Sequence, residues 1–153
     1  MTKLISYFIF FIIFTTNYFS EVIKPNKKIK PDQVVEIQLK GLINNDNPYT
    51  DIGIEQTWEF AHPNNRVFTG PLEKFKQMIY SDNYKILISH ENNETIILKE
   101  TSSKFIYKVY VLSKDKKKYY YIWQIEKVEQ EGKLKNCWMT TVVSDPIYLG
   151  ETI

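Results

Sequence analysis

Residues 60–71 read Phe-Ala-His-Pro-Asn-Asn-Arg-Val-Phe-Thr-Gly-Pro, and this stretch predicts a joint between two helices. Pro63 ends a preceding helix, and Pro63-Asn64-Asn65 is typical of a turn because asparagine tolerates left-handed dihedral angles. Thr69 or Gly70 can then cap a following helix that has Pro71 in its first turn. Since such a joint sets the angle between two helices, we expect it to organise the helical part of the fold.

Arg66 and His62 are the two basic side chains of this joint. The five donors of Arg66 can bind backbone carbonyls at a helix end. They can also clamp an anionic ligand beside the first turn of the following helix, whose free N–H groups favour negative charge. We favour the structural role for Arg66. We expect His62, just past a helix end, to cap that end or face solvent as a cation rather than to act as a general base.

The segments on either side of the joint have the apolar spacing of helices that face a core. Pro31-Asp32 suits a helix start, and the stripe that follows consists of Val35, Leu39, Leu42 and Ile43. A second helix is expected over residues 51–61, with Thr50 as its cap. A third is expected from residue 70, with the stripe Leu72, Phe75, Met78 and Ile79, and it ends at Ser81-Asp82-Asn83.

From Tyr84 onward the hydrophobic period changes from 3.6 to 2, which predicts a sheet. Strands are expected near residues 84–90, 94–100, 104–112, 118–128 and 136–144. The short connections between them require antiparallel pairing. Helices first and strands after predict one α+β domain over residues 31–146, preceded by a tether over residues 21–30 and followed by a C-terminal tail over residues 147–153.

The first twenty residues have the order of a secretory signal peptide. A short basic start is followed by an apolar run from Leu4 to Phe14 and then by polar residues. We expect residues 1–20 to be removed and the protein to be secreted or luminal. The alternative is a membrane anchor over residues 4–19, which is just short of a full span. Asn93-Glu94-Thr95 is a glycosylation acceptor pattern if the chain is luminal.

Several spaced motifs resemble one uncharacterised domain family of plants, cyanobacteria and other bacteria. They are Val34-Val35, Gln38-Leu39, Leu42, Asn45-Asp46, Gly53-Ile54, the run Phe60 to Pro71, Phe75, Met78 and Cys137-Trp138-Met139. That family looks like a branch of the cystatin-like superfamily of nuclear transport factor and ketosteroid isomerase. The resemblance spans residues 31–144 and implies a cone in which three helices pack on a curved, mainly antiparallel sheet of about five strands.

Aromatic side chains follow one face of the late strands. Tyr107, Val109 and Val111 share a face of one expected strand, and Tyr119, Tyr121, Trp123 and Ile125 share a face of the next. We interpret these rings mainly as core, with an apolar binding cavity as the alternative. Cys137 is interpreted as a small core residue, and His90 as turn surface at a strand end.

The composition restricts the function more than it identifies one. A net charge of +2 gives no field that would attract nucleic acid, and five glycines include no phosphate-binding loop. We expect no cofactor and no metal, because Cys137 has no metal-ligating partner motif. Candidate ligand-binding or helix-junction residues are His62, Asn65, Arg66, Thr69, Tyr107, Tyr121, Trp123 and Trp138.

The function favoured at this point is a non-catalytic module that binds a small apolar ligand or forms a homodimer through its sheet. The alternative is an isomerase or hydratase whose cavity is lined by Tyr and Trp. In the steroid isomerases an Asp base works opposite a Tyr and a protonated acid. Here the expected strands show no inward Asp, and Glu126 falls on the face opposite Tyr121 and Trp123. A membrane-anchored accessory protein is the second alternative.

Overall fold

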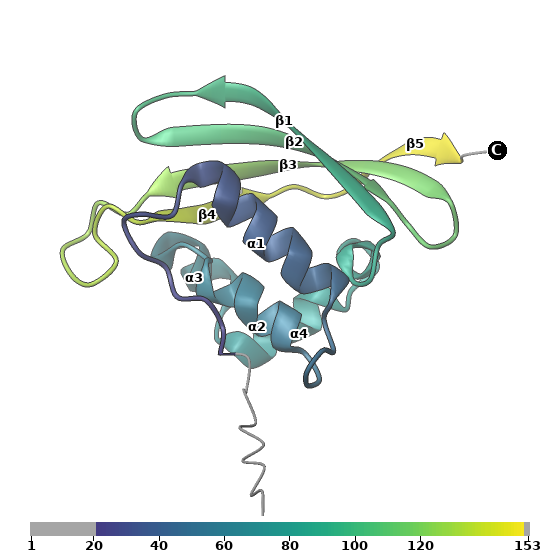
Figure 1. The fold of residues 1–153 in the computed structure, drawn as a ribbon, viewed down its shortest axis with the longest axis horizontal. Coiled ribbons are helices and arrows are strands. Elements are labelled where there is room, and N and C mark those ends of the chain that lie inside the picture. The colour runs from purple at the N-terminus through teal and green to yellow at the C-terminus, as the bar shows by residue number, and fades with distance from the viewer. Residues whose placement is uncertain (1–20, 152–153) are drawn as a thin grey trace, which may run out of the picture.

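The computed structural model describes residues 21–151. The expected signal peptide or anchor, residues 1–20, lies outside the described residues, as do residues 152–153. Within residues 21–151, four α-helices pack on one face of a five-stranded sheet, which confirms the α+β class (Figure 1). No helix in this part of the chain is long and apolar enough to cross a membrane.

The helical half contains one helix more than the three that were expected. The helices are α1 (Pro31–Ile43), α2 (Ile52–Glu59), α3 (Pro63–Thr69) and α4 (Leu72–Ile79). The start of α1 at Pro31 is confirmed, and the backbone N–H of Lys30 donates to the Gln33 side chain at 2.9 Å, which stabilises that start. α2 begins after Asp51 rather than after Thr50.

The prediction of a turn over Pro63-Asn64-Asn65 is wrong, because these residues form the first turn of α3. Proline fits this position, since the first N–H groups of a helix have no intrahelical partner and the fixed φ of proline is already helical. α3 is short and contains no buried residue. It therefore depends on contacts at its ends rather than on an apolar stripe.

The strand expected over residues 84–90 is also wrong. Lys85–Leu87 form a 3-10 helix, η1, and a turn leads from it into the sheet. The alternation of Tyr84, Ile86 and Ile88 imitates a strand. The burial instead follows a period of three, because Leu87 and His90 are buried and Tyr84 packs partly against the same core.

The sheet consists of β1 (Asn92–Glu100), β2 (Lys104–Leu112), β3 (Lys117–Lys127), β4 (Trp138–Val143) and β5 (Ile147–Glu151). Its order is β1-β2-β3-β4, and every strand pair is antiparallel. The tail expected over residues 147–153 contains β5. This strand pairs with Lys117–Tyr120 of β3, while β4 pairs with the other end of the same strand.

The core lies between the sheet and the helices. It receives Val34, Val35, Leu39 and Leu42 from α1, and Tyr107, Val109, Val111, Tyr121, Trp123 and Ile125 from β2 and β3. The interpretation of the aromatic face as core is therefore confirmed. Cys137 is buried in a smaller cluster with Val128 and Met139, as expected for a core residue, and burial raises the pKa of its thiol.

Candidate functional site

The joint between α2 and α3 is fastened to the free edge of β4. The backbone N–H of His62 donates to the Thr140 carbonyl at 2.8 Å, and the Thr140 N–H donates to the Phe60 carbonyl at 2.8 Å. The side-chain amide of Asn65 donates to the same Thr140 carbonyl at 3.3 Å. These bonds satisfy backbone groups at a strand edge that would otherwise be open to other chains. They also place α3 beside the sheet.

Arg66 has the structural role that was favoured for it. Its Nε donates to the Ala61 carbonyl at 3.0 Å, and one terminal nitrogen donates to the carbonyls of Trp58 and Glu59 at 2.9 and 3.0 Å. The guanidinium also lies over the Trp58 ring, 3.7 Å from its centroid. Arg66 is the only arginine in the chain. A planar, permanently charged fork suits several carbonyls at the negative end of a helix better than lysine does.

His62 does cap a helix, but the prediction of a cation at the end of the preceding helix is wrong. It is the N-cap of α3 and is only 3% exposed, and its Nδ1 accepts the backbone N–H of Asn64 at 3.1 Å. An acceptor at Nδ1 requires a neutral ring with its proton on Nε2. Burial lowers the pKa of His62, against the opposing effects of a bond to the Lys127 backbone and of the nearby Glu126 carboxylate.

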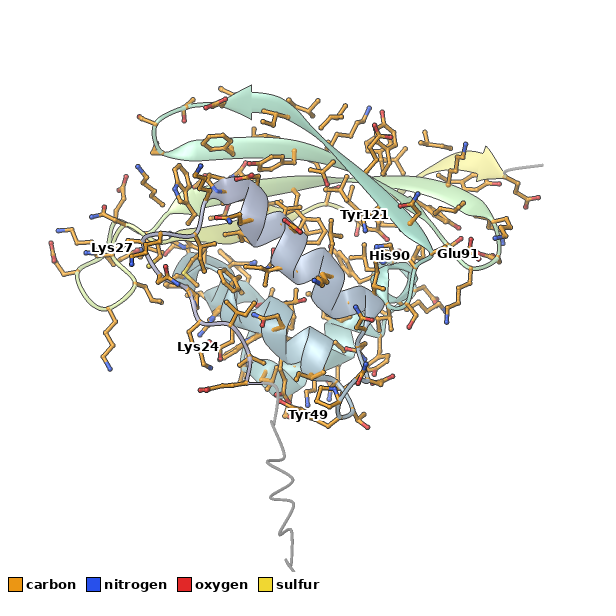
Figure 2. All side chains as sticks on the ribbon, in the orientation of Figure 1. Lys24, Lys27, Tyr49, His90, Glu91 and Tyr121 are labelled. Atoms are coloured by element: carbon orange, nitrogen blue, oxygen red, sulfur yellow. The ribbon has the colours of Figure 1, made fainter. Side chains whose placement is uncertain are left out.

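His90 is buried, so the prediction that it forms turn surface is wrong. It is 3% exposed, and its Nδ1 lies 2.7 Å from the Leu87 carbonyl. Its Nε2 lies 2.8 Å from the amide nitrogen of Asn93. The Leu87 carbonyl requires a proton on Nδ1, and the Asn93 amide nitrogen, which is a donor, requires a lone pair on Nε2. The ring is therefore neutral, and burial lowers its pKa. Figure 2 labels His90 beside Glu91 at the turn that leads into β1.

The contact between His90 and Asn93 involves the predicted glycosylation acceptor. Asn93 lies in β1, and the side-chain nitrogen that would carry the sugar is the atom that contacts His90. The side chain is half-buried. A glycan at Asn93 would therefore have to form before the chain folds or break this contact.

A cavity of about 230 Å³ lies between the joint, α4, η1 and β4. We call it the junction cavity. Its apolar wall comes from the end of α1, from α4, from η1 and from β4, and includes Leu42, Phe75, Met78, Ile79, Leu87 and Val143. Its polar wall includes Thr57, Asn65, Thr69, Trp123 and Thr140. The structure thus brings together three of the residues singled out from the sequence, Asn65, Thr69 and Trp123.

A buried hydrogen-bond network supports the polar wall. The Gln38 side chain accepts from Trp123 Nε1 at 3.0 Å and from Thr140 Oγ1 at 2.6 Å, and its amide donates to the Thr57 carbonyl at 3.0 Å. Gln38 is 1% exposed. Because every polar atom of this side chain has a partner, the network holds the indole and the two threonines in fixed positions.

One ionisable side chain, Tyr84, is found among the described residues that line the junction cavity. Its hydroxyl donates to the Val143 carbonyl at 3.1 Å. Burial, followed by the charge of Asp145, raises the pKa of Tyr84, so the group remains protonated at neutral pH. The cavity therefore presents neutral groups to a bound molecule. Within residues 21–151, no cluster of His, Cys, Asp and Glu could hold a metal ion.

The remaining candidate residues lie elsewhere. Tyr121 is buried next to Tyr84, with 6.5 Å between ring centroids, and its hydroxyl donates to the Asn83 carbonyl. Tyr107 and Trp138 both contact Phe105, at centroid distances of 6.0 and 5.2 Å, and neither lines the junction cavity. The Tyr107 hydroxyl is buried without a hydrogen-bond partner among the described residues, and burial raises its pKa.

A larger groove of about 560 Å³ runs between residues 21–30 and helices α1 and α2. The expected tether forms one side of it. The Gln56 side chain pairs with the backbone of Ile23 at 2.7 and 2.9 Å, and Lys24 forms an ion pair with Glu59. Figure 2 shows Lys24 and Lys27 along this segment. The groove is lined in part by the charged Glu36 and Lys40, so the smaller junction cavity is the better apolar site.

Sequence reasoning missed Gln38, Thr57 and Thr140 as parts of the site. One signal was present, because Gln38 is a polar residue between the apolar positions Val35 and Leu39 of α1. No protein-family model, curated protein or solved structure matches the chain. The geometry of the junction cavity is therefore the basis for a functional proposal.

Proposed function

We propose that this protein is a non-catalytic module that binds a small apolar molecule in the junction cavity. The observation that carries the proposal is the cavity itself, which has an apolar wall and a few polar groups held in place by the Gln38 network. Small-molecule sites in proteins have this composition. A buried polar network beside an apolar cavity also gives a ligand a defined orientation.

The size of the cavity limits the ligand. Its volume of about 230 Å³ is below the range of roughly 300–1,000 Å³ that is usual for drug-sized ligands. A cavity of about 150 Å³ is large enough for benzene. The ligand therefore has one or two small rings, or a short hydrocarbon chain.

The chemistry of the wall favours binding over proton transfer. An isomerase or hydratase needs a base and an acid that converge on the substrate. Of the described residues on this wall, Tyr84 alone is ionisable, and its raised pKa keeps it protonated at neutral pH, so it does not act as a base there. This supports the binding module over the enzyme alternative.

A matched pair of substitutions tests the proposal. Val143 lies on the cavity wall, whereas Val67 is 78% exposed on α3 and does not line the cavity. Protein-observed NMR titration with small aromatic hydrocarbons is expected to show saturable binding to the unaltered protein and to Val67→Phe. Val143→Phe fills the cavity and is expected to abolish binding. Equal binding by both variants, or no binding by the unaltered protein, would refute the proposal.

The second candidate function is self-association through the sheet. The helices cover one face of the sheet, and the opposite face carries Ile96, Tyr110, Tyr120, Ile122 and Val142 in neighbouring register positions (Figure 1). Ile96 and Val142 are 39% and 45% exposed. Exposed apolar patches of this kind are typical of interfaces. Sedimentation of the unaltered protein and of Ile122→Glu tests the idea, and a monomeric unaltered protein at high concentration would contradict it.

We also propose that the chain is a secreted or luminal member of the cystatin-like superfamily. Helices that precede the strands and pack on one face of an antiparallel sheet support this fold assignment. The apolar run from Leu4 to Phe14 supports export. N-terminal sequencing of the protein from its native cells separates the two alternatives, because a membrane-anchored accessory protein would retain residues 4–19.

A further inference from the structure

The hydroxyl groups on the wall of the junction cavity have already used their hydrogens. Three threonines each donate to a backbone carbonyl: Thr57 to Gly53 at 2.8 Å, Thr69 to Asn65 at 3.2 Å and Thr141 to Gln124 at 3.3 Å. A hydroxyl has one hydrogen to donate and two lone pairs that accept. Each of these oxygens can therefore still accept a hydrogen bond but has no further hydrogen to give.

The other polar donors on the wall are committed in the same way. Trp123 Nε1 and Thr140 Oγ1 both donate to Oε1 of Gln38, at 3.0 and 2.6 Å. The Tyr84 hydroxyl donates to the Val143 carbonyl at 3.1 Å. The Gln38 carbonyl oxygen lies behind the wall and accepts both of these hydrogens.

Asn65 is the exception among the described side chains of the wall. One hydrogen of its amide is used for the Thr140 carbonyl, so a second hydrogen remains. The threonine and tyrosine oxygens that can accept outnumber this single spare donor. No lysine or arginine lines the cavity among the described residues, and the Arg66 guanidinium is bound to the end of α2.

We infer that the junction cavity selects apolar ligands that carry one hydrogen-bond donor, such as a hydroxyl or a ring N–H. This inference rests on the proposed binding function. A ligand donor gains a hydrogen bond to one of the free lone pairs. A ligand acceptor gives up its hydrogen bonds to water and finds few donors on the wall. Binding of such a ligand is weaker, because a buried polar group without a partner bears its full desolvation penalty. A carboxylate is excluded, since nothing on the wall compensates its charge.

Three bicyclic compounds of equal size test this selectivity. Indole offers an N–H donor, benzofuran offers only an oxygen acceptor, and indene offers neither. The dissociation constant of each compound is measured by NMR titration of the intact protein. We expect indole to bind about tenfold more tightly than benzofuran, because one hydrogen bond is gained and one unpaired acceptor is avoided.

The outcomes separate this inference from the proposed function. If none of the three compounds binds, the proposed function fails and the inference fails with it. If all three bind with equal affinity, or benzofuran binds best, the cavity remains a binding site and only the donor selectivity is overturned. Val143→Phe provides the control, since it is expected to weaken all three together. A preference for indole that survives in Val143→Phe would place the interaction outside the cavity and would also overturn the inference.

Discussion

Replacing Arg66 by methionine tests whether the joint between α2 and α3 is held by a single side chain. Methionine retains much of the length and apolar surface of arginine but has no donors. The substitution removes three hydrogen bonds, to the carbonyls of Trp58, Glu59 and Ala61, and the stacking of the guanidinium on the Trp58 ring. The end of α2 would then have carbonyls that no side chain satisfies.

The expected loss of stability follows from these contacts. Hydrogen bonds to a charged group contribute about 1.5–3 kcal/mol each, and a cation over an aromatic ring contributes about 0.5–2 kcal/mol. These contributions are not additive, because all of them depend on one guanidinium and water can reach some of the freed carbonyls. We expect the free energy of unfolding to fall by about 3 kcal/mol, which lowers Tm by about 10 °C in a domain of this size.

Urea denaturation followed by circular dichroism measures this loss directly. Lys74→Met is the matched control, because Lys74 is exposed on α4 and, among the described residues, its side chain makes no hydrogen bond, ion pair or ring contact. Arg66→Lys is expected to recover only part of the loss, since an ammonium cannot reproduce the planar fork that reaches three carbonyls. The control is expected to stay within about 0.5 kcal/mol of the unaltered protein.

Two results would contradict this reasoning. The first is unfolding of Arg66→Met at the same urea concentration as Lys74→Met, which would mean that the three hydrogen bonds contribute nothing to folding. Alternatively the variant could remain stable and lose ligand binding. That result would make Arg66 a binding residue and reverse the choice between its two interpretations.

Three further predictions concern burial. Burial lowers the folded-state pKa of His62 and His90, so the unfolded chain binds protons first as the pH falls. The free energy of unfolding is therefore expected to be highest above about pH 6.5 and to fall as the pH drops below that value. Urea titrations from pH 7 to 5 check this, and His90→Gln is expected to reduce the dependence of stability on pH. A Cβ at Gly53 would lie 2.0 Å from the backbone oxygen of Gly41, whereas one at Gly41 meets its nearest atom at 3.2 Å. Thermal unfolding is therefore expected to show a much larger loss for Gly53→Ala than for Gly41→Ala, by about 3 kcal/mol. Tyr107→Phe removes a buried hydroxyl that has no hydrogen-bond partner within residues 21–151, and it is expected to leave stability unchanged or raise it by about 1 kcal/mol. A loss of stability above about 1 kcal/mol would contradict this.

Local patterns were reliable where one face of an element meets the core. The apolar spacing of residues 31–43 and 72–79 and the alternation in 104–112 each correspond to an element with nearly the expected bounds. The role of Arg66 was also accessible, because a helix end always offers free carbonyls and arginine suits them. In these cases the physical cause lies within a few residues along the chain.

The patterns failed where the decisive partner is distant. α3 has no buried stripe and depends on bonds to the edge of β4, and β5 exists because β3 extends beyond β4 and offers a second pairing segment. The alternation in residues 84–90 predicted a strand, yet the chain turns there to bring Leu87 and His90 into the core.

The sequence by itself determined a two-layer α+β domain, because amphipathic helices and half-buried strands each encode the face that they bury. Only the tertiary structure decided that there is a cavity and what its polar wall can offer a ligand. The Gln38 side chain binds Trp123 and Thr140 across separations of 85 and 102 residues. No local period reports on contacts at such distances, so the network that positions the wall of the junction cavity becomes visible only when the helices are packed on the sheet.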